Sequence, residues 1–268
     1  MRTVWSGRKL DVKETVYMPD MREAKIWSAV QDHHSAVIQA GYQPVMTVLT
    51  GSQNYGLDTE SSDYDTFTFV MPRRADIATI RDPVSTLMHG ELGHINIKDI
   101  RLALNLLKKT SPNSVEWFAT KYRLVEDRYK NIIGEHTPWV MFHCNTHHML
   151  NAIGGLVHQL TKRNMPSGKR FSHMLRMKNM LPRFFTRSET DLLGLDEYDR
   201  QLALFAKKNA SLDWDPLCKP LEEDIQRRIR EIDTTEWTAL EYDANLKVND
   251  LQSKLVKTLF DQDGDNNG

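Results

Sequence analysis

Two short apolar segments joined by a polar turn constrain the fold of this chain more than any other feature. Residues 45–49 are rich in β-branched side chains and end in Thr50-Gly51-Ser52, which predicts a strand closed by a tight turn. The segment 65–71 has the same character and stops at Pro72, so it predicts a second strand. Residues 91–97 are a weaker third candidate, because glycines stand at positions 90 and 93. A small sheet is therefore expected in the first half of the chain.

Helical periodicity accounts for most of the remaining sequence. Apolar residues recur at helical spacing over 21–40 and 99–109, so the N-terminal part is expected to be α/β. Strand signals fade beyond Pro138, and five helical segments are expected: 139–164, 167–187, 196–208, 217–232 and 235–260. We therefore expect an α/β domain, a mainly helical domain and a disordered polar tail, over 1–135, 136–260 and 261–268.

The overall composition is that of a soluble globular protein, with 26% charged and 40% apolar residues. No run of 18 apolar residues occurs, and the N-terminal segment lacks the apolar stretch of a secretory signal. The two cysteines, Cys144 and Cys218, lie far apart and have no metal-ligand spacing. These features predict a cytoplasmic location with no membrane partner.

The charges are distributed unevenly along the chain, although the net charge is only −1. Residues 136–188 contain eight Lys or Arg and six His but no Asp or Glu, whereas residues 189–268 contain 10 basic and 19 acidic side chains. One interpretation is that the basic segment forms a surface that meets phosphate groups. The other, compatible with the first, is that its cations pair with the acidic C-terminal part.

The segment between the first two strands carries the residues best suited to chemistry. Asp63 and Asp65 are two apart at the start of the second strand, so both carboxylates are expected on one face of the sheet. Two adjacent carboxylates favour a divalent cation, and Mg²⁺ prefers oxygen ligands of this kind, with Mn²⁺ as the alternative ion. Gly51 and Ser52 close the neighbouring strand, where backbone amides and a hydroxyl can approach an anion closely.

Three segments resemble the predicted nucleotidyltransferase branch, associated with RNA repair, of the DNA polymerase beta-like nucleotidyltransferase superfamily. The first combines Gly51-Ser52, Tyr55-Gly56-Leu57 and Ser62-Asp63-Tyr64-Asp65. The second, Ser111 to Trp117, is similar to the branch's Asn-Pro-x-x-x-Glu segment, and the third, Ser167 to Arg176, to its Lys-x-x-x-His-x-x-Arg helix. The resemblance spans roughly residues 44–187, and it implies a small mixed-sheet nucleotidyltransferase domain followed by a helical part.

The resemblance also implies a nucleotide-binding site shared between the two parts. Gly51, Ser52 and Tyr55 come from the first segment, and Lys169, His173 and Arg176 come from the third. The last three are spaced i, i+4 and i+7, so they share one helix face and are suited to hold a triphosphate. A solvated basic face is the alternative interpretation of this helix.

The chain departs from the superfamily at the third metal-binding carboxylate. Alignment of the third strand places His94 where an acid is expected, and the nearest carboxylates are Glu91 and Asp99. Glu91 needs a different register, and Asp99 stands where a helix N-cap is expected. Glu91 or Asp99 as the third acid, His94 as a base or ligand, and no third ligand all remain open at this point.

These observations predict a Mg²⁺-dependent nucleotidyltransferase of the cytoplasm. It is expected to transfer a nucleoside monophosphate from an NTP to an acceptor hydroxyl and to release pyrophosphate. ATP is the expected donor, so that AMP is transferred, and RNA is favoured over a protein or a small molecule as acceptor because of the basic segment. The alternatives are a catalytically weak nucleotide-binding module and a nucleic-acid-binding or toxin-neutralising partner.

Overall fold

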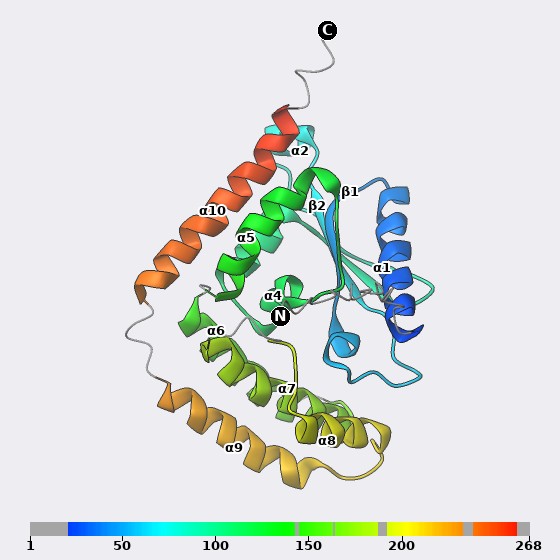
Figure 1. Ribbon diagram of the computed structural model, residues 1–268, viewed down its shortest axis with the longest axis vertical. Helices are drawn as coiled ribbons and strands as arrows, with labels where there is room; N and C mark the ends of the chain where they lie inside the picture. Colours follow the sequence, from blue (N-terminus) through cyan, green and yellow to red (C-terminus); the bar gives the residue numbers. More distant parts are fainter. Residues whose placement is uncertain (1–20, 143–144, 163, 187–191, 233–237, 262–268) are drawn as a thin grey trace, which may run out of the picture.

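The computed structural model describes residues 21–142, 145–162, 164–186, 192–232 and 238–261. Its centre is a five-stranded mixed sheet of order β3-β4-β2-β1-β5, in which β2 and β4 are parallel and the other neighbours antiparallel (Figure 1). The strands are β1 (Gln43–Leu49), β2 (Thr66–Met71), β3 (Ser85–His89), β4 (His94–Asp99) and β5 (Arg123–Val125). The expected mixed sheet is therefore confirmed.

Helices cover both faces of the sheet. Helix α1 (Met21–Gln39) lies along one face, and the helical C-terminal part lies on the other side (Figure 1). The remaining helices are η1 (Gly51–Tyr55), α2 (Arg74–Ala78), α3 (Ile100–Lys108), α4 (Pro112–Ala119), η2 (Asp127–Tyr129), α5 (Lys130–Phe142), α6 (Thr146–Lys162), α7 (Ser167–Thr186), α8 (Glu197–Lys208), α9 (Asp215–Glu231) and α10 (Thr238–Phe260).

Alternation along the central strands explains the two-sided core. On β2, Phe67 and Phe69 join a hydrophobic cluster with the helices of the C-terminal part, whereas Val70 packs with Val37 of α1 on the opposite face. Burial of both strand faces accounts for the nearly continuous apolar sequence of β1 and β2. The same alternation determines which side chains of β2 and β4 lie on the face of the sheet near Asp65.

Most of the expected strands and helices agree with the structure, and the main differences concern β4, β3, β5 and α5. The third strand begins at His94 rather than at residue 91, because residues 90–93 form the loop of the β3–β4 hairpin. Strand β3 was not expected, since it is an edge strand with mostly exposed residues, and β5 is only three residues long. Helix α5 starts at Lys130, well before the expected residue 139.

The expected domain boundary between residues 135 and 136 falls inside α5. One hydrophobic cluster also runs from the sheet through α6 and α7 to α10. The division into an α/β and a helical domain stays a prediction. The tail expected to be disordered lies outside the described residues apart from Asp261, and so does Cys144, while Cys218 is a buried free thiol. Within the described ranges, no helix has the length and apolar character needed to cross a membrane.

Candidate functional site

The turn after β1 lies directly beside the acidic pair. Gly51 has φ +79°, a conformation that favours glycine, and it starts the short helix η1. The amide of Thr50 donates to the carbonyl oxygen of Asp65 over 2.9 Å. A Cβ atom at Gly51 would stand 3.7 Å from Oδ2 of Asp65, so the turn and this carboxylate are in contact distance. The expectation that the turn faces the acidic pair is met in the geometry.

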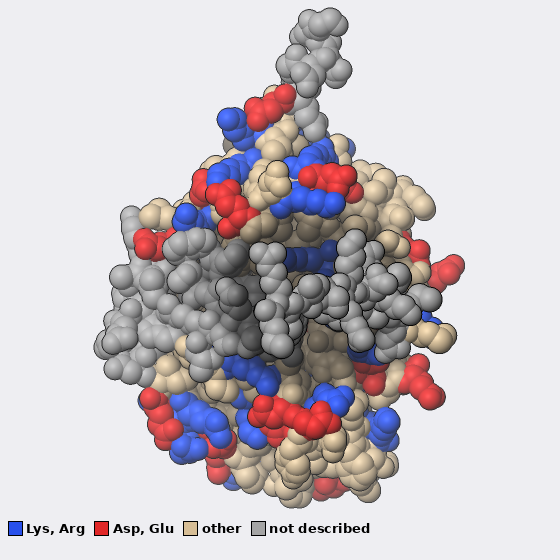
Figure 2. Space-filling model, viewed as in Figure 1, with Lys and Arg blue, Asp and Glu red and all other residues tan. Residues whose placement is uncertain are grey.

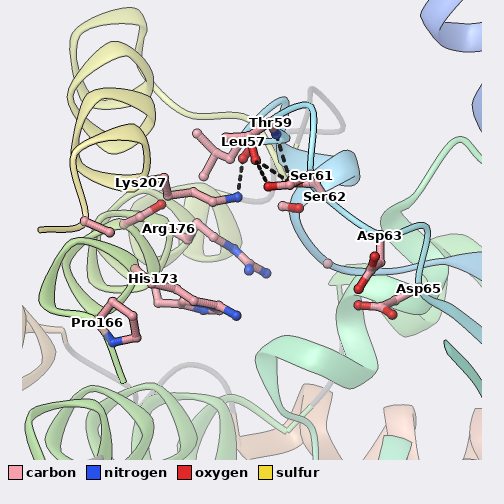
Figure 3. A pocket seen from close by; sticks show the side chains of 15 residues that line it. Leu57, Thr59, Ser61, Ser62, Asp63, Asp65, Pro166, His173, Arg176 and Lys207 are labelled. Atoms are coloured by element: carbon pink, nitrogen blue, oxygen red, sulfur yellow. Dashed lines mark hydrogen bonds between the residues drawn. The ribbon is translucent and has the colours of Figure 1, made fainter. Parts of the chain in front are cut away.

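Asp63 and Asp65 come immediately before β2 and line one cavity. Their carboxylates lie side by side at one side of that cavity (Figure 3). The backbone between them is fixed by the β3–β4 loop, because the amide of Tyr64 donates to the carbonyl oxygen of Leu92 over 2.9 Å. The two acids therefore share one side of the segment that leads into β2, although neither belongs to the strand itself.

His94 contacts the second of these acids. The parallel pairing of β2 with β4 places His94 next to Asp65, since Thr66 pairs with Ile95. The Nδ1 atom of His94 is 3.1 Å from Oδ1 of Asp65, and the backbone amide of His94 donates to the same oxygen over 3.2 Å. Both side chains are a little more than 40% exposed. His94 is therefore the β4 side chain that contacts the acidic pair.

Neither of the other two candidates for a third carboxylate is brought to the acidic pair. Asp99 is buried at the far end of β4, five residues and roughly 16 Å along the strand from His94 at about 3.3 Å per residue. It caps α3 and pairs with Arg101, whose NH2 lies 2.7 Å from its Oδ2. The structure thus places Asp99, one of the alternatives that the sequence left open for the third acid, in a helix cap and not beside the acidic pair. Glu91 is exposed in the hairpin loop and does not line the cavity.

The cavity next to the acidic pair has a volume of about 390 Å³ and a cationic opposite wall. That wall is formed by α7, which contributes Lys169, His173 and Arg176, and by α8, which contributes Lys207. Ser52 and the hydroxyl residues of the loop 59–62 also line the cavity. The structure therefore places acids and cations on opposite sides of one cavity, as Figure 3 shows.

Arg176 is held by two buried partners. Its guanidinium stacks on the ring of Tyr55 at 3.5 Å from the centroid, and its NH2 lies 3.7 Å from Oε2 of Glu116. Glu116 Oε1 accepts hydrogen bonds from the amide of Gly51 and from Asn54 Nδ2, both over 2.9 Å. Burial raises the pKa of the Glu116 carboxyl, and the charge of Arg176 opposes this effect. This buried network connects the turn after β1 to helix α7.

The network changes the expected roles of two residues. Tyr55 was expected to contact the nucleotide, but it is buried, does not line the cavity and instead supports Arg176. The amide of Gly51 was expected to bind phosphate, but it donates to Glu116. The role of Tyr55 changes because Arg176 packs on its ring, and that of the Gly51 amide changes because the Glu116 carboxylate accepts its hydrogen bond.

Lys207 is the cation that the sequence did not reveal. A Cβ atom at Gly168 would lie 2.1 Å from the carbonyl oxygen of Ala206, so only glycine lets α7 approach α8 this closely. This contact places Lys207 at the cavity, where its Nζ donates to the carbonyl oxygen of Leu57. Burial lowers the pKa of Lys207, and the nearby charges of Lys169 and Arg176 lower it further. Lys207 lies beyond the segments that carried the resemblance, so no local signal marked it.

Much of the basic segment pairs with acidic residues of the C-terminal part. Salt bridges join Lys178 to Asp199 and Arg183 to Asp196, each with an N–O distance of 2.8 Å. Arg170 lies 3.4 Å from Asp215. Basic and acidic side chains are interspersed on the face shown in Figure 2. The pairing interpretation of the uneven charge distribution is therefore confirmed for these residues.

The donor set at Asp63 and Asp65 fits a small, hard divalent cation. Two carboxylates are available, and phosphate or water oxygens can complete an octahedron around Mg²⁺. Within the described ranges, no three His, Cys, Asp or Glu side chains form a cluster that could hold a metal ion without a ligand's help.

The comparisons with known proteins agree with this geometry. No curated protein matches the chain at a significant level. A family model described as RNA repair pathway DNA polymerase beta family matches residues 28–181, which is more than half of the 268 residues. The match includes the turn, both acids, His94 and the cations of α7. The chain belongs to the RNA repair pathway DNA polymerase beta family.

Proposed function

We propose that the protein is a Mg²⁺-dependent nucleotidyltransferase that moves a nucleoside monophosphate from an NTP to an acceptor hydroxyl. Family membership supports nucleotidyltransferase activity. The observation that carries the proposal is the paired carboxylates of Asp63 and Asp65, which face a cavity with a cationic opposite wall. This arrangement suits a triphosphate that is neutralised from two sides. ATP is proposed as the donor, and an RNA end as the acceptor.

Each side of the cavity has a distinct task in this reaction. Asp63 and Asp65 hold the metal ion, which neutralises charge on the phosphates when it is bound. Lys169, Arg176 and Lys207 supply positive charge for the departing pyrophosphate. The acceptor oxygen forms a bond to the α-phosphorus, and the bond from that phosphorus to the bridging oxygen breaks.

His94 is the proposed acceptor of the hydroxyl proton. Because an ionised Asp65 can only accept hydrogen bonds, Nδ1 of His94 must donate to it. The neutral ring then has its lone pair on Nε2, which can take a proton from an acceptor hydroxyl. The same contact with Asp65 fixes the orientation of the ring.

The test of the proposed function is direct. The protein is incubated with Mg²⁺, each α-labelled NTP and an RNA with a free 3′ hydroxyl, and label transfer and pyrophosphate release are measured. We expect both products with ATP and neither after chelation of the metal by EDTA. Pyrophosphate release without labelled RNA would contradict RNA as the acceptor and leave transfer to another hydroxyl.

One observation favours a second candidate function, nucleotide binding without turnover. Asp65 is engaged with His94, and no third acid joins the pair among the described residues. Tight, metal-dependent binding of ATP with no pyrophosphate release from any NTP would favour this candidate over the transferase.

Lys169 provides a test of the phosphate-binding wall. Lys169→Ala is expected to raise the KM for NTP by about tenfold to a hundredfold, because a charge-assisted hydrogen bond contributes about 1.5–3 kcal/mol, while kcat changes little. Steady-state kinetics with the labelled NTP measure both constants. Lys219→Ala is the matched control, since Lys219 is exposed on α9 and does not line the cavity. An unchanged KM together with a lower Tm would instead assign Lys169 to a solvated structural face.

A further inference from the structure

A second cavity lies on the same face of the sheet as the acidic pair. It has a volume of about 490 Å³ and is enclosed by β2, β4, α4, α6 and α7. Side chains alternate along a strand, so Phe67 shares a face with Asp65, and Asn96 shares a face with His94. Phe67 and Asn96 pair across β2 and β4, and both line this cavity. The cavity therefore begins one side-chain position inward from the catalytic candidates.

The two cavities adjoin each other. Gly51, His173 and Arg176 line both of them. Gly51 is also the residue in contact distance of Asp65 Oδ2. A molecule that extends from one cavity into the other would thus pass the acidic pair at its middle.

The chemistry of the second cavity differs from that of the first. Its walls are mainly apolar, formed by Leu156 and other aliphatic side chains and by Phe67 and Trp117, whose rings stack at a centroid distance of 4.1 Å. Polar groups stand at its edges, among them the Asn96 and Asn113 amides, the Ser111 hydroxyl and the side chains shared with the first cavity. Flat heterocycles with polar edges fit cavities of this composition, and the volume lies within the usual range of ligand sites, about 300–1,000 Å³.

We infer that the second cavity binds the nucleoside, base and ribose together, of the NTP whose phosphates occupy the first cavity. This inference rests on the proposed function. A nucleotide has the same division, with an uncharged heterocycle on one side of the α-phosphate and anionic groups on the other. The acidic pair then lies at the α-phosphate, where the transfer occurs.

The charges around the second cavity favour a nucleoside over the end of an acceptor strand. An acceptor strand carries phosphates that need free cations. Lys98 Nζ donates to Ser85 Oγ over 2.6 Å, and Arg176 is paired with Glu116. Lys98 is thus the one lining cation of this cavity, among the described residues, that is not shared with the first cavity and not paired with a carboxylate, which is fewer than a phosphate-bearing strand needs, whereas an uncharged nucleoside requires none.

The test compares two probes, ATP and inorganic tripolyphosphate, each with Mg²⁺, by isothermal titration calorimetry. Leu156→Trp adds an indole inside the second cavity. We expect it to raise the Kd for ATP about tenfold or more, since stacking of a base contributes about 1–3 kcal/mol, and to leave the Kd for tripolyphosphate unchanged. Leu246→Trp is the matched control, because Leu246 is exposed on α10 and remote from either cavity lining.

Asn96→Ala provides a second variant that adds no bulk. It is expected to raise the Kd for ATP about three- to tenfold, the value of one neutral hydrogen bond, again without an effect on tripolyphosphate. Unchanged ATP binding in both variants would overturn the inference, and a rise only in the KM for the acceptor would assign the cavity to the acceptor end. Wild-type protein that binds neither probe would overturn the proposed function as well, so the two failures are distinguishable.

Discussion

Asp65→Asn is expected to lower the rate of nucleotidyl transfer by about a thousandfold or more while the protein remains folded. Neutralisation of developing phosphate charge by a bound metal is worth several kcal/mol, and each 1.36 kcal/mol corresponds to about a tenfold change in rate. Asparagine removes the charge that holds the ion but keeps an oxygen that can accept from the His94 amide. Label transfer from ATP under single-turnover conditions measures the effect.

Glu60→Gln is the matched control for this substitution. Glu60 is exposed in the loop that leads to the acidic pair, and it does not line the first cavity. The control removes the same amount of negative charge close to the site, so it separates metal placement from a general change in potential. Transfer by Asp65→Asn within about threefold of wild type, against the expected thousandfold, would refute the assignment of Asp65 as a metal ligand.

Glu116→Ala is expected to have the largest effect on stability, about 3–5 kcal/mol in the free energy of unfolding. Removal of one partner of a buried ion pair leaves an uncompensated charge. Here Arg176 would remain buried on the Tyr55 ring without its carboxylate, and the Gly51 amide and Asn54 would lose their shared acceptor. Urea denaturation followed by circular dichroism measures the change.

Two further variants show whether the loss of stability comes from the missing hydrogen-bond acceptor. Glu116→Gln keeps an oxygen for Gly51 and Asn54, so a smaller loss of stability is expected than for alanine. Asn113→Ala is the control on the same helix, since Asn113 is exposed about one turn earlier. If Glu116→Ala denatured at the wild-type urea concentration, the network would have no structural role, and Arg176 would have to be positioned by other contacts.

The buried network also explains how a strand turn and a distant helix can form one site. Gly51 stands at the end of β1 and Arg176 on α7, and Glu116 of α4 contacts both. A carboxylate at this position orients the cation and the turn at the same time. Loss of Glu116 is therefore expected to affect phosphate binding as well as stability.

The sequence alone determined the local features of this protein. The strand before Gly51-Ser52, the strand after Asp63-Tyr64-Asp65 and the helix with Lys169, His173 and Arg176 were all predictable, because each follows from a short-range pattern. Periodicity of two placed the acids together, and periodicity of about 3.6 placed the cations on one helix face.

Only the tertiary structure decided which groups meet across the chain. The pairing of β2 with β4 places His94, rather than Glu91 or Asp99, next to Asp65. The packing of α7 on α8 places Lys207 at the cavity. These contacts join residues that are far apart in sequence. A single sequence contains the periodicity of each element but not the register between elements, so neither contact could be derived from it.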